Sequence, residues 1–375
     1  MICKRCLNQD KNLFITIKGE ALCRVCIHLM GKLSEEQETH DFVLTPLSLD
    51  FELTSLQQKI STFLCEHGLY EDILVEAVCG AGKTELVMEL IHKALEKGLS
   101  VGWMVARRQV VLQLHHRLKK AFNSVKVLAV TSGYTSDLQA DLIICTAHQL
   151  YRFPNRFDLL IVDEPDAYPY KGNKMLEGIL EVSSKGTKIY LSATPNSKIM
   201  KSVTQHVTLD SRAHNRPLVI PKVFKSFKSI GFIYLLYLLK QLQYKQVLIF
   251  VPTIELANKL SKGLKLKKIT SQSEEKDRML TEFENSLFNH LICTTVLERG
   301  MTFEKVNVIV YQADHVVFDE ASLIQISGRV GRSFKESEGD CWFITSSKNS
   351  SVNSCLMRLK NHNQRANGVL SPTTQ

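Results

Sequence analysis

Four cysteines near the start of the chain have the spacing of a metal site. They form two pairs, each with two residues between its members, and sixteen residues separate the pairs: Cys3, Cys6, Cys23 and Cys26. Four thiolates at this spacing can surround one Zn2+ tetrahedrally, and the segment has too few apolar residues to bury them in a core of its own. A site closed by four protein ligands leaves no position for water, so we expect zinc to hold the segment together.

Residues 77–84 have the residue types of a phosphate-binding loop. The glycines let backbone N–H groups approach phosphate oxygens closely, at the N-terminus of a helix. Lys83 is placed to reach the β and γ phosphates, and the Thr84 hydroxyl is placed to ligate Mg2+. The pattern therefore predicts a nucleoside triphosphate site built from Gly80, Ala81, Gly82, Lys83 and Thr84.

Two carboxylates follow an apolar run and would complete that chemistry. Asp163 comes directly after residues 159–162, and Glu164 is next. A carboxylate at the C-terminal end of a strand beside a phosphate loop is where nucleoside triphosphatases hold Mg2+. We expect Asp163 to bind the metal through its water shell and Glu164 to orient and deprotonate the attacking water. Alone, such an acidic stretch is more often a solvated turn, but its pairing with Lys83 favours catalysis.

Two arginines in residues 325–332 supply the third element. Arg329 and Arg332 are three residues apart, which places both on one helical face. A planar guanidinium suits the transition-state charge on a γ phosphate. These arginines belong to the other α/β half of the chain, so we expect them to complete the site only when the two halves close around ATP.

Short apolar runs alternate with helical patterns from residue 73 onward, and these elements must position the catalytic groups. The alternation is typical of an α/β fold, with helices on both faces of a parallel sheet. After Thr84, apolar residues recur at helical spacing as far as Leu95, which predicts one helix with a buried stripe. The predicted strands are residues 73–78, 101–105, 141–145, 158–162, 188–191, 247–251, 291–293 and 306–311.

Changes in pattern divide the chain into five parts. Polar residues and two prolines interrupt the alternation at residues 211–221, which we interpret as an interdomain linker. The predicted parts are residues 1–50 (zinc-binding knuckle and connector), 51–210 (first, ATP-binding domain), 211–221 (linker), 222–365 (second domain) and 366–375 (polar tail).

The composition is that of an ordinary globular protein, with 375 residues, 44% of them apolar and 23% charged. These values argue against a disordered, collagen-like or coiled-coil chain. The longest apolar run, residues 232–239, is far shorter than the about 20 residues of a membrane-spanning helix. With no secretory signal visible, we expect a cytosolic protein whose thiols stay reduced. The six scattered cysteines are then expected to be small core residues: Cys65, Cys79, Cys145, Cys293, Cys341 and Cys355.

The net charge of +9 is unevenly distributed. Residues 211–375 hold 23 lysines and arginines against 14 acidic residues, whereas residues 1–210 are nearly balanced. A lysine-rich solvated surface and a basic face for a polyanion would both produce this excess, and charge alone does not separate them.

Taken in order, the phosphate loop, the acidic stretch 163–166, Ser192-Ala193-Thr194 and residues 325–332 resemble the motifs of helicase superfamily two, the DEAD/DEAH-like ATPases. The resemblance covers about residues 50–345. The cysteine pairs ahead of the motor, together with residues 163–170 and 297–303, are similar to those of the ComFA family, the late-competence ATPases of Gram-positive bacteria that help to draw DNA into the cell. The resemblance implies two RecA-like domains in tandem and ATP, Mg2+ and Zn2+ as cofactors.

The same resemblance implies roles for further residues. Gln57 would read adenine, and Ser192 and Thr194 would couple hydrolysis to domain movement. The residues implied to contact DNA are Arg107, Arg108, Thr146, Thr294 and Arg299. Phosphate contacts are hard to recognise from residue type, so alternatives stay open. Arg107 and Arg108 could be ordinary surface residues, and Thr146 could cap the turn after its strand.

The function implied by the resemblance is ATP-driven translocation of single-stranded DNA during natural competence. The motor would work at the inner face of the membrane beside the DNA uptake channel, with a phosphoribosyltransferase-like competence protein, ComFC, as partner. The alternatives are a PriA-like replication-restart helicase, another DNA or RNA helicase of the superfamily, and a non-catalytic nucleic-acid adaptor. PriA-like proteins carry their zinc cysteines within the motor, whereas here the cysteines precede it, which argues against that alternative. The adaptor is disfavoured because an adaptor would gain nothing from the complete set of catalytic residues.

Overall fold

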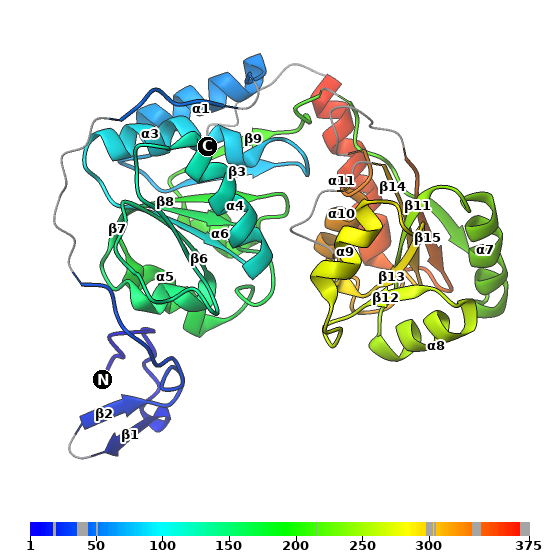
Figure 1. The fold of residues 1–375 in the computed structure, drawn as a ribbon, viewed down its shortest axis with the longest axis horizontal. Helices are drawn as coiled ribbons and strands as arrows, with labels where there is room; N and C mark the ends of the chain where they lie inside the picture. Colours follow the sequence, from blue (N-terminus) through cyan, green and yellow to red (C-terminus); the bar gives the residue numbers. More distant parts are fainter. Residues whose placement is uncertain are drawn as a thin grey trace. The chain divides into compact units, whose positions relative to one another are not determined.

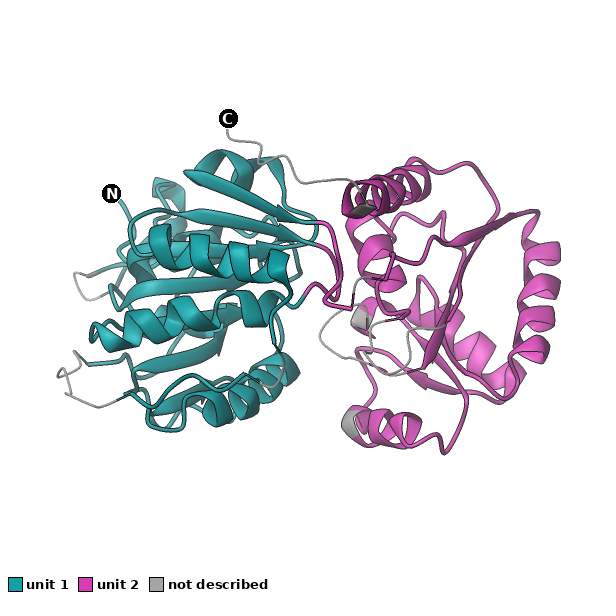
Figure 2. Ribbon diagram, turned by 90° about the horizontal axis from the view of Figure 1, so that it is seen from above, with its two compact units in different colours: residues 1–77, 82–209, 372–375 teal, residues 78–81, 210–371 magenta. Residues whose placement is uncertain are grey.

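The computed structural model describes residues 1–17, 20–35, 44–49, 52–214, 216–297, 303, 305–331 and 339–367. The chain forms two compact units, each with its own sheet (Figure 1 and Figure 2). Among the described residues, unit 1 comprises those within 1–77 and 82–209, and unit 2 comprises those within 78–81 and 210–367. Both units are of the α/β class, which confirms the predicted fold class.

Unit 1 contains a seven-stranded parallel sheet with the strand order β5-β6-β4-β7-β8-β3-β9. Every residue of β4 is buried, so both faces of the sheet are covered there. Because the strands are parallel, their C-terminal ends lie along one edge of the sheet. The strands are β3 (Ile73–Ala77), β4 (Val101–Val105), β5 (Val127–Val130), β6 (Leu142–Thr146), β7 (Phe157–Asp163), β8 (Ser184–Ser192) and β9 (Gln205–Leu209).

The helix predicted after the phosphate loop is interrupted. The chain turns at Val87, whose backbone N–H donates to the carbonyl of Glu85, so a short turn that carries Lys83 precedes the longer helix with the predicted buried stripe. The helices of unit 1 are α1 (Ser55–His67), α2 (Lys83–Leu86), α3 (Met88–Glu96), α4 (Arg108–Ala121), α5 (Lys174–Ser183) and α6 (Ser197–Ser202), with the 3-10 helix η2 (Ala147–Arg152).

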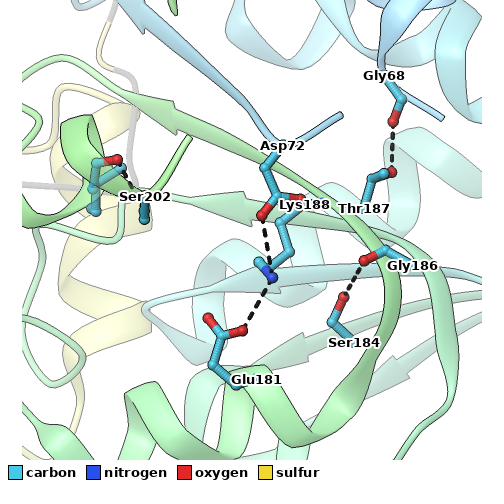
Figure 3. Close-up of polar contacts among 9 residues, drawn as sticks. Gly68, Asp72, Glu181, Ser184, Gly186, Thr187, Lys188 and Ser202 are labelled. Atoms are coloured by element: carbon cyan, nitrogen blue, oxygen red, sulfur yellow. Dashed lines mark hydrogen bonds and ion pairs between the residues drawn. The ribbon is translucent and has the colours of Figure 1, made fainter. Parts of the chain in front are cut away.

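A largely buried lysine ties β8 to its surroundings in unit 1 (Figure 3). The ammonium of Lys188 lies 3.2 Å from a carboxylate oxygen of Asp72 and 3.1 Å from one of Glu181 in α5. Asp72 also accepts the backbone N–H of Lys188 at 2.8 Å, and the hydroxyl of Thr187 donates to the carbonyl of Gly68 at 2.6 Å. These bonds hold β8 beside β3 and thereby fix the position of its last residue, Ser192.

Unit 2 contains a six-stranded parallel sheet with the order β10-β15-β14-β11-β13-β12. The strands are β10 (Lys222–Lys225), β11 (Gln246–Phe250), β12 (Lys267–Ile269), β13 (His290–Cys293), β14 (Val306–Tyr311) and β15 (Cys341–Thr345). The helices are α7 (Lys228–Gln241), α8 (Ile254–Leu264), α9 (Lys276–Glu284), α10 (Glu320–Ser327) and α11 (Ser350–Asn367), with the 3-10 helix η3 (Thr295–Leu297).

Residues 211–221, predicted to be a linker, are held within unit 2. The buried guanidinium of Arg212 donates to the carbonyls of Val330 and Gly331 at 2.9 and 2.5 Å. Asn363 in α11 bonds both the N–H and the carbonyl of Leu218, at 2.7 and 2.9 Å. One residue ahead of the segment, Asp210 lies 2.5 Å from His362 in the same helix. The segment therefore has the fixed contacts of a domain element.

The eight predicted strands are all present. β4 and β14 have the predicted bounds, the ends of the other six are shifted, and β8 is the most extended, at Ser184–Ser192. Among the described residues, seven further strands were not predicted: the N-terminal pair β1 (Phe14–Ile17) and β2 (Glu20–Cys23), and β5, β9, β10, β12 and β15. The six scattered cysteines are buried, as expected. Among the residues that the structure describes, no helix is both long and apolar enough to span a membrane.

Candidate active site and metal centre

The phosphate loop links β3 to α2 and requires glycine at two positions. Gly80 and Gly82 have φ angles of 83° and 77°, in the left-handed region that side chains disfavour. A Cβ atom on Gly82 would also lie 2.5 Å from the amide nitrogen of Gln57. Lys83 Nζ donates to the carbonyl of Ala77 at 3.0 Å, so the lysine folds back across the loop. Ala81 is buried within the loop and Thr84 follows Lys83 in α2, so the five predicted loop residues are contiguous in one tight turn.

Gln57, predicted to read adenine, lies beside this loop at the start of α1. Its side chain accepts the backbone N–H of Thr54 at 2.8 Å, while the Thr54 hydroxyl accepts the backbone N–H of Gln57 at 3.3 Å. This reciprocal arrangement is a capping box, which satisfies donors at the helix start. The capping box holds a buried amide group within reach of the phosphate loop.

Asp163 is the last residue of β7, is partly buried and lies close to the carboxylates of Glu164 and Asp166. Burial, followed by the neighbouring Glu164 carboxylate, raises the pKa of Asp163 to about 7, although Lys83 draws it the other way. Glu164 has a left-handed φ of 52°, and its backbone N–H donates to the carbonyl of Leu191 in β8 at 2.9 Å. A buried acid crowded by like charge is stabilised by a cation, so these residues fit Mg2+, with Thr84 and Asp163 as the groups that would hold it.

Asp166 joins the acidic stretch to the end of β8. One of its carboxylate oxygens accepts the Ser192 hydroxyl at 2.7 Å, and the other accepts the Thr194 hydroxyl at 2.6 Å. The backbone N–H of Thr194 in turn donates to the Ser192 hydroxyl oxygen at 3.0 Å. All three side chains are buried. Short hydrogen bonds therefore join the acidic stretch to the end of β8.

The four N-terminal cysteines come together as predicted. Their sulfur atoms all lie within 4.8 Å of one another, with Cys3 and Cys26 at 3.6 Å and Cys6 and Cys23 at 3.8 Å. Sulfurs at about 2.3 Å from a tetrahedral zinc ion are about 3.8 Å apart, so the cluster fits Zn2+. Burial raises the pKa of the Cys6 thiol to about 11, and a bound cation would reverse that by stabilising the thiolate.

The cysteine module, residues 1–34, packs against the body of unit 1. Gly178 in α5 lies so close that a Cβ atom there would be 2.0 Å from the carbonyl oxygen of Cys6. The Tyr151 hydroxyl donates to the carbonyl of Met30 at 3.0 Å. Arg152 Nη1 donates to the carbonyl of Lys32 at 2.8 Å, and the Arg152 carbonyl accepts the N–H of Ser34 at 2.7 Å. The cysteine module is thus part of unit 1.

The residues expected to contact DNA in unit 1 lie at the same sheet edge. Arg107 lies between β4 and α4, Arg108 is the first residue of α4, and Thr146 ends β6, which pairs with β4. Arg108 is exposed and stacks 5.7 Å from the ring centre of Tyr134. Thr146 makes no side-chain capping bond to η2, so the capping alternative is wrong.

The predicted residues of unit 2 are less completely defined. Thr294 is buried directly after β13. The placement of Arg329 and Arg332 on one helical face is wrong for Arg329, because α10 ends at Ser327 and the arginine lies buried in the turn after Gly328. The other two predicted arginines, Arg299 and Arg332, lie outside the described residues.

Three groups at or near the site were not singled out from the sequence. Asp166 was seen only as part of an acidic stretch, although an acid followed by paired hydroxyls after the next strand is a usable signal. Arg212 was assigned to a linker, and the contacts of Gly178 depend on tertiary packing that no local pattern reveals.

Residues 50–197 match a family model described as "Type III restriction enzyme, res subunit", and residues 231–334 match "Helicase conserved C-terminal domain". The chain is 31% identical to competence protein ComFA of Bacillus subtilis (strain 168), over 97% of this chain and 86% of that protein. It is 32% identical to competence protein ComFA of Streptococcus pneumoniae, over 98% of this chain and 91% of that protein.

Among solved structures, the chain is similar to S. cerevisiae Dbp5 bound to RNA and ADP BeF3, with a TM-score of 0.66 and 18% identity over 83% of this chain and 88% of that chain. At that identity the likeness shows the fold alone. It confirms the prediction of two RecA-like domains.

Proposed function

Because the chain belongs to the ComFA family of competence proteins, we propose that it translocates single-stranded DNA during DNA uptake. The chain is an ATP-hydrolysing enzyme with the two domains of a helicase-like nucleic-acid motor. Such a fold implies ATP and Mg2+. The choice of single strand, the movement along it and the use in uptake are the parts that we propose.

The observation that carries the proposal is the buried network between Asp166, Ser192 and Thr194. A carboxylate whose neighbours bind Mg2+ and orient water is bonded directly to hydroxyls at the end of the next strand. Hydrolysis changes the charge at this edge, and the network passes that change to β8. Simple hydrolysis has no use for such a connection, whereas a motor that must convert hydrolysis into movement does.

We assign the following roles. Lys83 binds the β and γ phosphates, Asp163 and Thr84 hold Mg2+, and Glu164 orients and deprotonates water. The remaining residues of the phosphate loop and Gln57 bind the nucleotide. Transition-state charge is stabilised by Arg329 and Arg332, and the DNA backbone is contacted by Arg107, Arg108, Thr146, Thr294 and Arg299.

The deciding experiment compares ATP turnover with single-stranded DNA, duplex DNA and RNA at equal nucleotide concentration. We expect single-stranded DNA to stimulate turnover most. Movement is measured separately by displacement of streptavidin from a biotinylated oligonucleotide end, with Lys83→Ala as the inactive control. Stimulation by RNA alone would overturn the DNA-uptake role and favour an RNA helicase.

The zinc module is proposed to be structural. Cys23→Ser should remove zinc, as measured by metal analysis of the purified protein, and loosen residues 1–34 to proteolysis. ATP binding should persist, because the phosphate loop, residues 77–84, lies outside residues 1–34. A wild-type protein without zinc would refute this assignment.

Two further parts of the proposal concern cellular context. We propose that the motor works at the inner face of the membrane, beside the DNA uptake channel, and that a ComFC-like competence protein is its partner. Both follow from the family and are tested by co-purification from competent cells and by fractionation.

A further inference from the structure

Unit 2 exposes a group of large apolar side chains on and beside α7, here called the α7 surface. Its members share substantial exposure and lie within one short stretch of sequence: Val223, Phe227, Ile230, Ile233, Leu236, Tyr237 and Tyr244. The exposed fractions of Phe227, Ile233 and Tyr244 are 79%, 63% and 86%. Single exposed apolar residues need no explanation, but a group of this size on one element marks an interaction site.

The opposite side of α7 packs against the core of unit 2. Leu235, Leu238 and Leu239 are buried in the core of unit 2. On the outer side, Ile230, Ile233 and Tyr237 project within about 60° of one another at about 100° per residue. A helix that is apolar on both sides is expected to be covered on both sides.

Aromatic stacking fixes part of the outer side. The ring of Tyr234 stacks on Phe224 of β10 with centroids 4.0 Å apart, and Tyr237 stacks on Tyr234 at 6.0 Å. The contact with Tyr234 therefore holds the ring of Tyr237 in place, while more than half of the surface of Tyr237 stays exposed. The surface is preformed, which lowers the entropic cost of binding.

The charged residues of the segment that carries the α7 surface are all basic, and one of them, Lys222, is paired with Asp340 at 2.7 Å. Between Asp210 and Glu255 the sequence holds seven lysines and arginines and no acidic residue. Lys225 and Lys228 are exposed at the start of α7, and Lys240 and Lys245 at its end. Among the ion pairs of the described residues, none involves these four lysines. These four lysines therefore favour an occupant that supplies negative charge.

This charge decides between the possible occupants. A second copy of the chain would bring lysines against lysines, because α7 contains no acid to pair with them. Phe227 and Tyr244, the most exposed members, lie at the two ends of the helix with aliphatic residues between them. Aromatic ends, an aliphatic middle and flanking lysines are the composition of a helix that lies in the interface of an anionic bilayer.

We propose that the α7 surface binds the anionic face of a lipid bilayer and holds the motor there without spanning it. The inference rests on the proposed function, to which it adds the part of the chain that would contact the membrane and the class of lipid. Apolar side chains would enter the boundary between headgroups and acyl chains, and the four lysines would lie against lipid phosphates.

The test uses the full-length protein and vesicles of phosphatidylcholine, alone or mixed with an equal amount of phosphatidylglycerol. Sedimentation should show binding to the mixed vesicles and little to phosphatidylcholine. Ile233→Asp should weaken the partition by about tenfold or more, and Lys225→Gln or Lys228→Gln by about fivefold each, with less binding at high salt.

Matched controls lie in the same unit. Leu287→Asp alters an apolar residue that is 71% exposed but outside the α7 surface, and Lys259→Gln with Lys262→Gln removes two exposed lysines of α8. These controls should bind like wild type. Equal loss in Leu287→Asp and Ile233→Asp would overturn the proposal, as would a dimer that only Ile233→Asp dissociates or binding of an acidic protein at α7 without binding of vesicles.

Turnover stimulated by single-stranded DNA separates this inference from the proposed function. Stimulated turnover without vesicle binding overturns the α7 assignment and leaves the motor intact. Vesicle binding without stimulation does the reverse. If Ile233→Asp misfolds, the double variant Phe227→Ser, Tyr244→Ser changes only the two most exposed rings and must still reduce vesicle binding for the proposal to stand.

Discussion

The two units contain the same local arrangement in different surroundings: an aspartate after one strand accepts two hydroxyl groups at the end of the neighbouring strand. Each such arrangement is called a device below. In unit 1, Asp166 follows β7 by three residues and accepts hydroxyls at and just after the end of β8. In unit 2, Asp314 follows β14 by three residues and accepts the hydroxyls of Ser346 and Ser347 after β15, each at 2.8 Å. Both devices join the ends of two neighbouring parallel strands.

The surroundings decide what each device can do. The unit 1 device is buried beside a second carboxylate, Asp163, and the phosphate loop. The unit 2 device is partly solvated, and its serines lower the pKa of Asp314 against the opposing effect of burial. We therefore propose that these bonds act as a coupling element in unit 1 and form an ordinary turn in unit 2, because solvent screens the unit 2 carboxylate from nearby charge.

The largest effect should come from removing catalytic groups next to the buried device. Lys83→Ala and Glu164→Gln should each lower ATP turnover by about 100-fold or more, because they remove phosphate binding and the general base. Phosphate release with saturating single-stranded DNA measures this, and fluorescence anisotropy should show DNA binding intact. Lys97→Ala and Glu96→Gln are matched surface controls in unit 1. Turnover that survives in both catalytic variants would place the site elsewhere.

A glycine pair compares helix packing in the two units. Gly178→Ala should destabilise unit 1 by about 3 kcal/mol, because the new methyl group would meet the Cys6 carbonyl. Gly263→Ala in α8 should stabilise unit 2 by about 0.5–1 kcal/mol, since nothing lies within 4 Å of the added atom. Urea unfolding and proteolysis of residues 1–34 report the outcome. A neutral Gly178→Ala would mean that the cysteine module does not rest on α5.

Hydroxyl removal tests the two devices directly. Thr194→Val should cost about 1–2 kcal/mol, because it leaves a buried Asp166 oxygen without its donor. Ser346→Ala should cost under about 0.5 kcal/mol, since water can replace the lost bond. Thr194→Val should also reduce streptavidin displacement more than ATP turnover. Equal losses of stability in both variants would remove the distinction between the units.

The smallest effect concerns the stability of unit 2 at low pH. The depressed pKa of Asp314 means that its ionised form stabilises the folded state at neutral pH, and this contribution is lost as the pH falls below about 4, the ordinary value. Ser347→Ala removes one donor and should move that loss to higher pH. Unfolding of unit 2 as a function of pH measures the shift, and an unchanged profile in Ser347→Ala would contradict the role of the serine.

The buried parts of both sheets could be predicted from the sequence because parallel strands covered on both faces read as continuous apolar runs. β4 and β14 match their predicted bounds at Val101–Val105 and Val306–Tyr311. The positions of the groups proposed for catalysis could also be predicted, since phosphate and Mg2+ chemistry restricts the residue types and ties them to strand ends. Lys83 begins the helix after β3, Asp163 is the last residue of β7, and the four cysteines converge.

The elements that could not be predicted are set by tertiary contacts and turns and leave no clear pattern in the local sequence. The edge strands β10 and β12 contain lysines and only three or four residues, so they lack a run to recognise. The apolar strand β15 should have been found from its composition and was not. The end of α10 at Ser327 follows from the turn at Gly328, which helical periodicity cannot locate.

The bonds of Arg212, Leu218 and Asp210 within unit 2 have a practical consequence for dissecting the molecule. Unit 2 expressed alone from residue 222 would lose the side chain that holds the carbonyls of Val330 and Gly331, and with it the local scaffold of Arg329. A transplant of this unit into another motor should therefore be joined between Leu209 and Asp210, so that the donor protein contributes the segment that its own arginine turn rests on.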